Sequence, residues 1–154
     1  YSTDQVGLAG LSLGAVTSAI AFSQEPAIKA IWLDSPFVDF DTMFTFELSR
    51  YHLPAFSKYG VNILSKLLLG TRPDELSCRD ALRNADGRAI FLTQGEEDVR
   101  IPISQGQTFA ELAKDSNAHF ETWFVPDTDH VDAMFLYPYT YQDKMRTFFN
   151  EFLG

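Results

Sequence analysis

Short apolar segments alternate with helix-like segments along this chain, and this alternation limits its possible folds more than any other feature. Strand character is found at residues 6–9, 27–33, 89–93 and 119–125. Small or periodically apolar stretches at 15–22, at 103–114 and after Pro138 predict helices between and after the strands. Parallel strands joined through helices require right-handed crossovers. We therefore predict an α/β fold with a mainly parallel four-stranded sheet and helices on both of its faces.

The composition is that of a globular protein with an acidic balance. Of 154 residues, 45% are hydrophobic, and 21 acidic against 12 basic residues give a formal net charge of -9. This charge makes nucleic acid and anionic membrane surfaces poor partners. The longest apolar stretch, residues 61–69, contains polar residues and falls far short of the ~20 residues that span a bilayer. Cys78 is the only cysteine, which excludes an intrachain disulfide and fits a reducing, cytoplasmic compartment.

Residues 35–85 depart from the alternating pattern. About fifty residues stand there, where a crossover needs far fewer. Aromatic and aliphatic side chains crowd the segment. We predict a helical, lid-like insertion over an apolar pocket; a helical subdomain with its own small core is the alternative.

Gly10, Ser12 and Gly14 form a G-x-S-x-G pattern between the first predicted strand and the helix after it. A nucleophile on a strained strand-to-helix turn needs small neighbours, and we expect both glycines to provide this room. The helix directs its free N–H groups and its positive end back at the turn, so the N–H of Leu13 is expected to donate to an oxyanion. The pattern predicts Ser12 as a nucleophile, and an ordinary glycine-rich turn is the alternative.

A serine hydroxyl needs a base to remove its proton, and we expect His130 to be that base. His130 follows the fourth predicted strand. In a parallel sheet the carboxyl ends of all strands meet at one edge, which is also where Ser12 lies. His52 falls in the insertion and His119 at the opposite end of a strand, so both are expected to be surface or packing residues.

The imidazole needs a carboxylate that holds its tautomer and stabilises its charged form. We predict Asp98, in the loop after the third strand, for this role. Glu96 and Glu97 compete in the same loop, and Asp34 and Asp39 follow the second strand at the same edge. No cluster of histidines and carboxylates has the spacing of metal ligands, so neither a metal nor an organic cofactor is expected.

Ser12, Asp98 and His130, in this order, resemble the catalytic triad of the α/β-hydrolase superfamily. Residues 10–14 match its nucleophile elbow, and residues 95–102 match its G-x-x-D-x-x-[VI]-P loop. Within the superfamily, the chain is similar to serine esterases related to the prolyl-oligopeptidase group, in the segment around Asp34 and in its apolar insertion. The resemblance covers essentially the whole chain.

The chain also departs from that family pattern. Gln94 stands where many relatives have histidine, and Thr128 and Asp129 replace the small glycines that often precede the catalytic histidine. The family sheet has eight strands, of which this chain supplies the equivalents of strands five to eight. The resemblance thus implies a partial domain over residues 1–154 with an exposed first strand, open to homodimer formation. Since Tyr1 is not an initiator Met, we expect that residues precede it.

The resemblance implies a serine hydrolase that cleaves a carboxylic ester or related acyl bond of a small molecule through an acyl-enzyme at Ser12. The loop after strand three, which donates the second oxyanion N–H in relatives, is missing here. Loss of such a donor costs ~10²–10³ in rate, so we expect this fragment to be weak or inactive. A peptidase or thioesterase on the same triad is one alternative, and a non-catalytic fragment that self-associates through its sheet edge is another.

Overall fold

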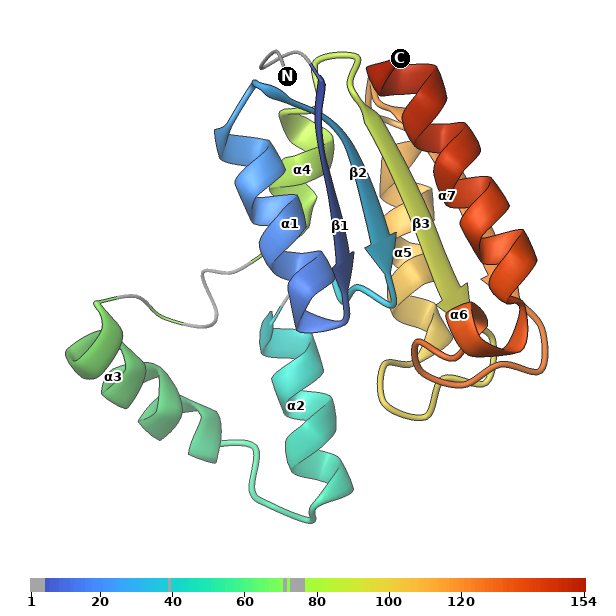
Figure 1. Ribbon diagram of the computed structural model, residues 1–154. Coiled ribbons are helices and arrows are strands. Elements are labelled where there is room, and N and C mark those ends of the chain that lie inside the picture. The colour runs from blue at the N-terminus through green and yellow to red at the C-terminus, as the bar shows by residue number, and fades with distance from the viewer. Residues whose placement is uncertain (1–4, 39, 71, 73–76) are drawn as a thin grey trace.

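The computed structural model describes residues 5–38, 40–70, 72 and 77–154. Within these residues, four parallel strands form one sheet in the order β1-β2-β3-β4. The strands are β1 (Val6–Leu11), β2 (Ile28–Asp34), β3 (Ala89–Gly95) and β4 (His119–Val125). The helices are α1 (Leu13–Gln24), α2 (Phe40–Arg50), α3 (Ser57–Leu69), α4 (Arg79–Arg83), α5 (Ile103–Ala113), α6 (Ala133–Leu136) and α7 (Pro138–Leu153). The predicted α/β fold is confirmed (Figure 1).

Three strands reach further toward their carboxyl ends than the sequence predicts. β1 continues to Leu11, which pairs with Asp34 of β2. β3 continues through Gly95, which pairs with Val125 of β4. Only β4 has the predicted bounds. Because all four strands are parallel, their carboxyl ends lie at one edge of the sheet, from which the site loops leave.

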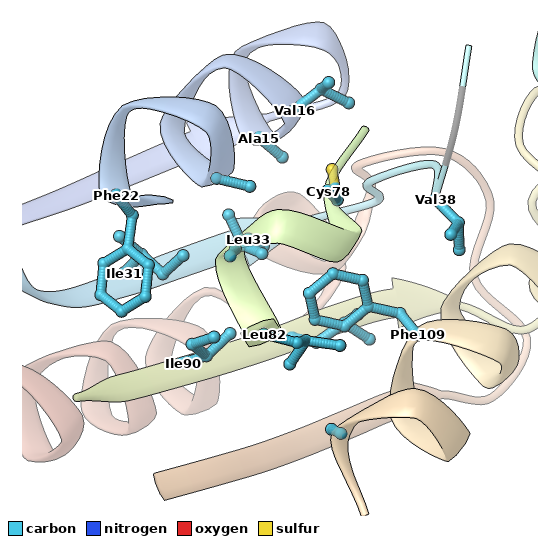
Figure 2. Close-up of a cluster of buried hydrophobic side chains, with 14 of the residues drawn as sticks. Ala15, Val16, Phe22, Ile31, Leu33, Val38, Cys78, Leu82, Ile90 and Phe109 are labelled. Atoms are coloured by element: carbon cyan, nitrogen blue, oxygen red, sulfur yellow. The ribbon is translucent and has the colours of Figure 1, made fainter. Parts of the chain in front are cut away.

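Two clusters of buried apolar side chains lie on opposite faces of the sheet. Successive strand residues point to opposite faces, so Ile31 and Leu33 join the first cluster and Trp32 joins the second. The first cluster lies under α1, α4 and α5, and Figure 2 shows its side chains converging between these helices and the strands. The second lies under α7. Helices therefore cover both faces, as predicted.

α7 begins at Pro138, as the sequence predicts, and packs on the second cluster through one face. Tyr141 and Phe148 on this face are buried. The partly buried residues of α7 that pack beside them are Met145, Phe149, Phe152 and Leu153. None of the helices in the described part of the chain is both long and apolar enough to cross a membrane.

Residues 35–85 contain α2, α3 and α4, and α2 and α3 extend beyond the edge of the sheet at which the strands end (Figure 1). Several buried side chains of this segment belong to the first cluster: Phe37, Val38, Cys78, Ala81, Leu82 and Ala85. The apolar side chains of α3 are largely exposed, among them Tyr59, Ile63, Leu64, Leu67 and Leu68. Leu48 of α2 is also buried but belongs to neither cluster, so a subdomain with its own small core stays the alternative. A role of the segment as a lid stays a prediction.

β1 is one edge of the sheet and β4 is the other. Within the described residues β1 pairs with β2 alone, and its residues Val6 and Leu11 are 39% and 42% exposed. The exposed first strand expected from the sequence is therefore present. Homodimer formation through this edge stays a prediction.

Candidate active site

Ser12 lies on the turn between β1 and α1, in a backbone conformation that residues other than glycine rarely adopt. Its φ is 54° and its ψ is -121°, and a positive φ is strained for any residue but glycine. The Ser12 N–H donates to the carbonyl oxygen of Asp34 at 2.8 Å, which fixes the turn to the end of β2. A Cβ at Gly10 would collide with the carbonyl group of Gly14, so a side chain at position 10 would force the turn open.

The second glycine of the pattern has a different status. A Cβ at Gly14 would meet no atom of this chain within 4 Å, because Gly14 lies on the exposed side of α1. A collision therefore excludes a side chain at Gly10, whereas the described residues show no collision at Gly14, whose expected role stays a prediction. Leu13, expected to donate to an oxyanion, is the first residue of α1. N–H groups in the first turn of a helix have no partner within the helix, which leaves the Leu13 N–H available to a ligand at the turn.

The structure brings Ser12, His130 and Asp98 into one hydrogen-bonded chain. The Nε2 of His130 lies 3.0 Å from the Oγ of Ser12, and its Nδ1 lies 2.8 Å from an oxygen of Asp98. The side chain of His130 is 8% exposed and that of Asp98 is fully buried. An ionised carboxylate only accepts hydrogen bonds, so Nδ1 carries the imidazole proton and Nε2 faces the serine hydroxyl as an acceptor.

Asp98 is held by its own loop. Its Oδ1 accepts hydrogen bonds from the N–H groups of Arg100, at 2.9 Å, and Ile101, at 2.8 Å, while its Oδ2 faces His130. The two competing acids of this loop, Glu96 and Glu97, are exposed. Of the three, the structure places Asp98 alone against the imidazole.

The other two histidines lie away from the serine. His52 is exposed in the turn after α2. His119 begins β4, at the opposite end of the sheet, where its ring packs against that of Phe152 with the ring centroids 5.5 Å apart. Asp39 lies outside the described residues. Among the residues that the structure does describe, no group of three or more His, Cys, Asp or Glu side chains is placed to hold a metal ion.

The prolyl oligopeptidase family matches the chain over residues 1–154, that is, over its whole length. The chain belongs to the prolyl oligopeptidase family. No curated protein sequence gave a significant match.

Solved structures with this fold include esterases and a peptidase. An esterase of Pyrococcus furiosus is 23% identical with a TM-score of 0.70, over 97% of this chain and 55% of the esterase. The acylaminoacyl peptidase of Pyrococcus horikoshii is 18% identical with a TM-score of 0.73, over 99% of this chain and 25% of the peptidase. Acetyl xylan esterase 1 from Thermoanaerobacterium is 17% identical with a TM-score of 0.67, over 97% of this chain and 46% of the esterase. The chain thus spans about half the length of the first of these proteins.

In this member of the prolyl oligopeptidase family, Gln94 anchors the acid loop, that is, residues 96–102, which carry Asp98. It is fully buried at the end of β3, and its Nε2 donates to the carbonyl oxygen of Ile101 at 2.7 Å and to that of Pro102 at 3.4 Å. Ile101 also donates its N–H to Asp98. The glutamine that departs from the family pattern therefore fixes the far side of the loop that carries the carboxylate.

Asp34, the competing acid at the end of β2, contacts the Ser12 backbone and binds two hydroxyl groups through its side chain. Its carboxylate is 1% exposed and accepts hydrogen bonds from the hydroxyl groups of Tyr141, at 2.9 Å, and Ser35, at 3.0 Å. The Tyr141 hydroxyl in turn accepts from Nε1 of Trp32 at 3.0 Å. The sequence suggests Tyr141 only as a core residue of α7, because nothing in the helical spacing shows that its hydroxyl reaches a carboxylate.

Burial raises the pKa of Asp34 from its ordinary value of 3.8 to about 6, although the hydrogen bonds from Tyr141 and Ser35 oppose the rise. The folded state therefore favours the protonated carboxyl. The resulting stability is fully present below pH 3.8 and is lost as the pH rises through about 6. The difference between the two pKa values corresponds to about 3 kcal/mol.

We therefore expect wild type to lose about 2 kcal/mol of unfolding free energy relative to Asp34→Asn as the pH rises from 4 to 7, because part of the total is already lost at pH 4. Urea unfolding of both proteins across this range measures the difference. The control is Asp115→Asn, which removes an exposed carboxylate. A difference between wild type and Asp34→Asn that stays constant with pH would show that burial does not control this carboxyl.

Proposed function

We propose that this chain is part of a serine hydrolase that cleaves a carboxylic ester or related acyl bond of a small-molecule substrate. The observation that carries the proposal is the hydrogen-bonded chain from Ser12 through His130 to Asp98, with distances of 3.0 and 2.8 Å, on a strained strand-to-helix turn. Membership of the prolyl oligopeptidase family supports a serine hydrolase. The fold shared with two esterases supports the choice of an ester.

In the proposed reaction, the Oγ of Ser12 attacks the carbonyl carbon while the Nε2 of His130 takes the hydroxyl proton. The C–O bond to the leaving group breaks, His130 gives it the proton, and an acyl ester remains on Ser12. Nε2 then deprotonates a water molecule that attacks this ester, and the carboxylic acid is released as the proton returns to Oγ. Asp98 holds Nδ1 and stabilises the imidazolium in both steps.

The oxyanion of each tetrahedral intermediate needs hydrogen-bond donors beside Ser12. The N–H of Leu13, at the start of α1, supplies one, and the positive end of this helix adds to it. The resemblance to the α/β-hydrolase superfamily implies that a second donor comes from residues beyond this chain. We propose that the isolated chain is weak for this reason, because one such donor contributes ~10²–10³ in rate.

Peptide bond cleavage is the second candidate, and two of the comparisons support it. The chain belongs to a family named for an oligopeptidase and shares its fold with an acylaminoacyl peptidase. The same three side chains perform both reactions, and what differs is the leaving group that His130 protonates. Rates of hydrolysis of a short acyl ester, an acyl thioester and a prolyl amide by the full-length protein separate the classes. Turnover of the amide alone would displace the ester proposal.

A fluorophosphonate probe tests the nucleophile directly. We expect the probe to attach to Ser12 of the full-length protein, because His130 removes the hydroxyl proton and the probe resembles the attacked acyl group. Mass spectrometry of the digested protein locates the modified residue. Ser12→Ala should label neither at position 12 nor elsewhere, whereas Ser104→Ala, which changes an exposed serine of α5, should label as wild type does.

Either of two results would make us abandon this function. One is a wild-type protein that hydrolyses esters but takes no label at Ser12. The other is a Ser12→Ala protein that keeps full hydrolytic activity.

A further inference from the structure

Asp129 connects the two loops that carry the imidazole and the carboxylate. Its Oδ1 accepts a hydrogen bond from the N–H of Val99 at 3.0 Å and another from the N–H of His130 at 2.7 Å. Val99 directly follows Asp98 in the chain. A single oxygen atom therefore holds the backbone on both sides of the contact between His130 and Asp98.

Backbone contacts bring the same two loops together further back. The Glu97 N–H donates to the carbonyl oxygen of Thr128 at 3.0 Å, and the Glu96 N–H donates to that of Val125 at 2.9 Å. A Cβ at Gly95 would collide with the Thr128 carbonyl oxygen, so the loops approach this closely only because position 95 has no side chain. These contacts end at Glu97, and beyond them Asp129 continues the connection.

Three consecutive N–H groups of the acid loop donate hydrogen bonds to carboxylates. Those of Arg100 and Ile101 donate to Asp98, and that of Val99 donates to Asp129. Val99 is 64% exposed, whereas Ile101 is buried in the first cluster, so apolar packing holds the loop at Ile101 but not at Val99. The position of Val99 therefore depends on its bond to Asp129.

The loop that carries His130, residues 126–132, is called the histidine loop here. It needs contacts from other parts of the molecule because its backbone is strained. Val131, next to His130, has a φ of 54°, a conformation that is unfavourable for a β-branched residue. Strain of this kind costs about 1–3 kcal/mol and persists only where neighbouring contacts enforce it. The bond from the His130 N–H to Asp129 lies within this loop, and the bond from the Val99 N–H to the same oxygen joins the loop to the rest of the molecule.

We propose that Asp129 is a positioning residue that locks the histidine loop to the acid loop and so holds the His130 imidazole against both Asp98 and Ser12. This proposal rests on the proposed function, since it assigns a role in the same triad. Asp129 touches neither the substrate nor the reacting atoms, and it acts through the backbone of Val99 and His130. The departure from the family pattern at this position then has a consequence, because a glycine there has no side-chain oxygen to bridge the loops.

The bridge is ionic on the Asp129 side. The two backbone N–H groups, with that of Val99 contributing most, lower the pKa of the Asp129 carboxyl below its ordinary value. Hydrogen bonds to an ionised acceptor are about twice as strong as neutral ones. An asparagine at this position keeps the accepting oxygen but loses the charge, which makes Asp129→Asn the conservative variant and Asp129→Ala the disruptive one.

Steady-state kinetics of the full-length protein test the proposal. We expect Asp129→Ala to lower kcat by about 10-fold to 100-fold with KM nearly unchanged, because a small misplacement of the base affects the reacting geometry and not substrate binding. Asp129→Asn should recover most of this loss. Asp127→Asn removes an exposed charge from the same loop and should behave as wild type. All assays are made well below each variant's Tm, so that a loss of stability alone leaves kcat unchanged.

A measurement without substrate separates this proposal from the proposed function. The proton on Nδ1 of His130, held by Asp98, gives a low-field NMR resonance whose rate of exchange with water reports how firmly the two loops are joined. We expect exchange to be at least 10-fold faster in Asp129→Ala than in wild type, and close to wild type in Asp129→Asn. Equal exchange rates in wild type and Asp129→Ala would overturn the lock, whether or not the protein hydrolyses any substrate. If wild type hydrolyses no substrate but exchange is still faster in Asp129→Ala than in wild type, the result would support the lock and count against the proposed hydrolase function.

Discussion

Replacing His130 with alanine in the full-length protein is expected to lower kcat/KM for a short acyl ester by about 10⁴-fold to 10⁶-fold. The reason is geometric, because Nε2 of His130 is the base placed 3.0 Å from the Ser12 hydroxyl. Without it, the hydroxyl keeps its proton and attacks as a poor nucleophile. What remains is the contribution of substrate binding and of the oxyanion donors.

The two other histidines provide matched controls for this prediction. His52 is exposed after α2, and His119 lies at the opposite end of the sheet. Alanine at either position should leave kcat/KM within about 2-fold of wild type, since surface changes away from the site have small effects. A large loss in His52→Ala or His119→Ala, with His130→Ala still active, would assign the base to another residue.

Trp32 carries the second large expected effect, which is on stability. Its indole is fully buried, stacks on Phe91 with ring centroids 4.0 Å apart, and packs edge-on against Tyr141 and Phe148 of α7. Trp32→Ala empties this space between the sheet and α7, and we expect it to lower the free energy of unfolding by about 4–5 kcal/mol. Urea unfolding at pH 7 measures the change.

Two variants isolate the cause of that loss. Trp32→Phe keeps an aromatic ring but removes the Nε1 donor to Tyr141, and should cost about 1–2 kcal/mol. It remains measurable even where Trp32→Ala does not fold. Trp123→Ala removes the only other tryptophan, which is half-buried on the edge strand β4, and should cost less than Trp32→Ala. Equal losses in Trp32→Phe and Trp32→Ala would assign the effect to the hydrogen bond and not to packing.

The fold could be predicted from the sequence because local pattern and tertiary structure agree along most of the chain. β4 has the predicted bounds, since residues 119–125 are rich in aromatic and β-branched side chains and end at Pro126. The early predicted end of β1 has a physical reason. Gly10 and Leu11 resemble a turn locally, and they are strand residues only because they pair with Leu33 and Asp34.

The helices of residues 35–85 could not be placed from the sequence. α3 has a clear apolar face, which includes Tyr59, Ile63 and Leu67, but in the described part of the chain this face is exposed and packs on no part of the sheet. α2 buries only Leu48 among its described residues. Because neither helix is buried in the main core, its apolar pattern does not show where it lies beside the sheet.

The candidate site divides in the same way. Ser12, His130 and Asp98 could be selected from the sequence because each follows a strand of one parallel sheet, and topology alone brings such residues together. The contacts that support these three residues could not be predicted from the sequence. The Tyr141 hydroxyl on Asp34 and the Asp129 oxygen between two loops depend on side-chain positions that no local pattern encodes.

The hydroxyl and the imidazole of the site stand 118 positions apart in the chain, and the imidazole comes second. A ribosome therefore produces the serine 118 residues before the histidine, and the helix that carries Tyr141 follows later still. A nascent chain that ends between the two residues contains the serine without the imidazole. Any cleavage that depends on both side chains must wait until synthesis has passed His130.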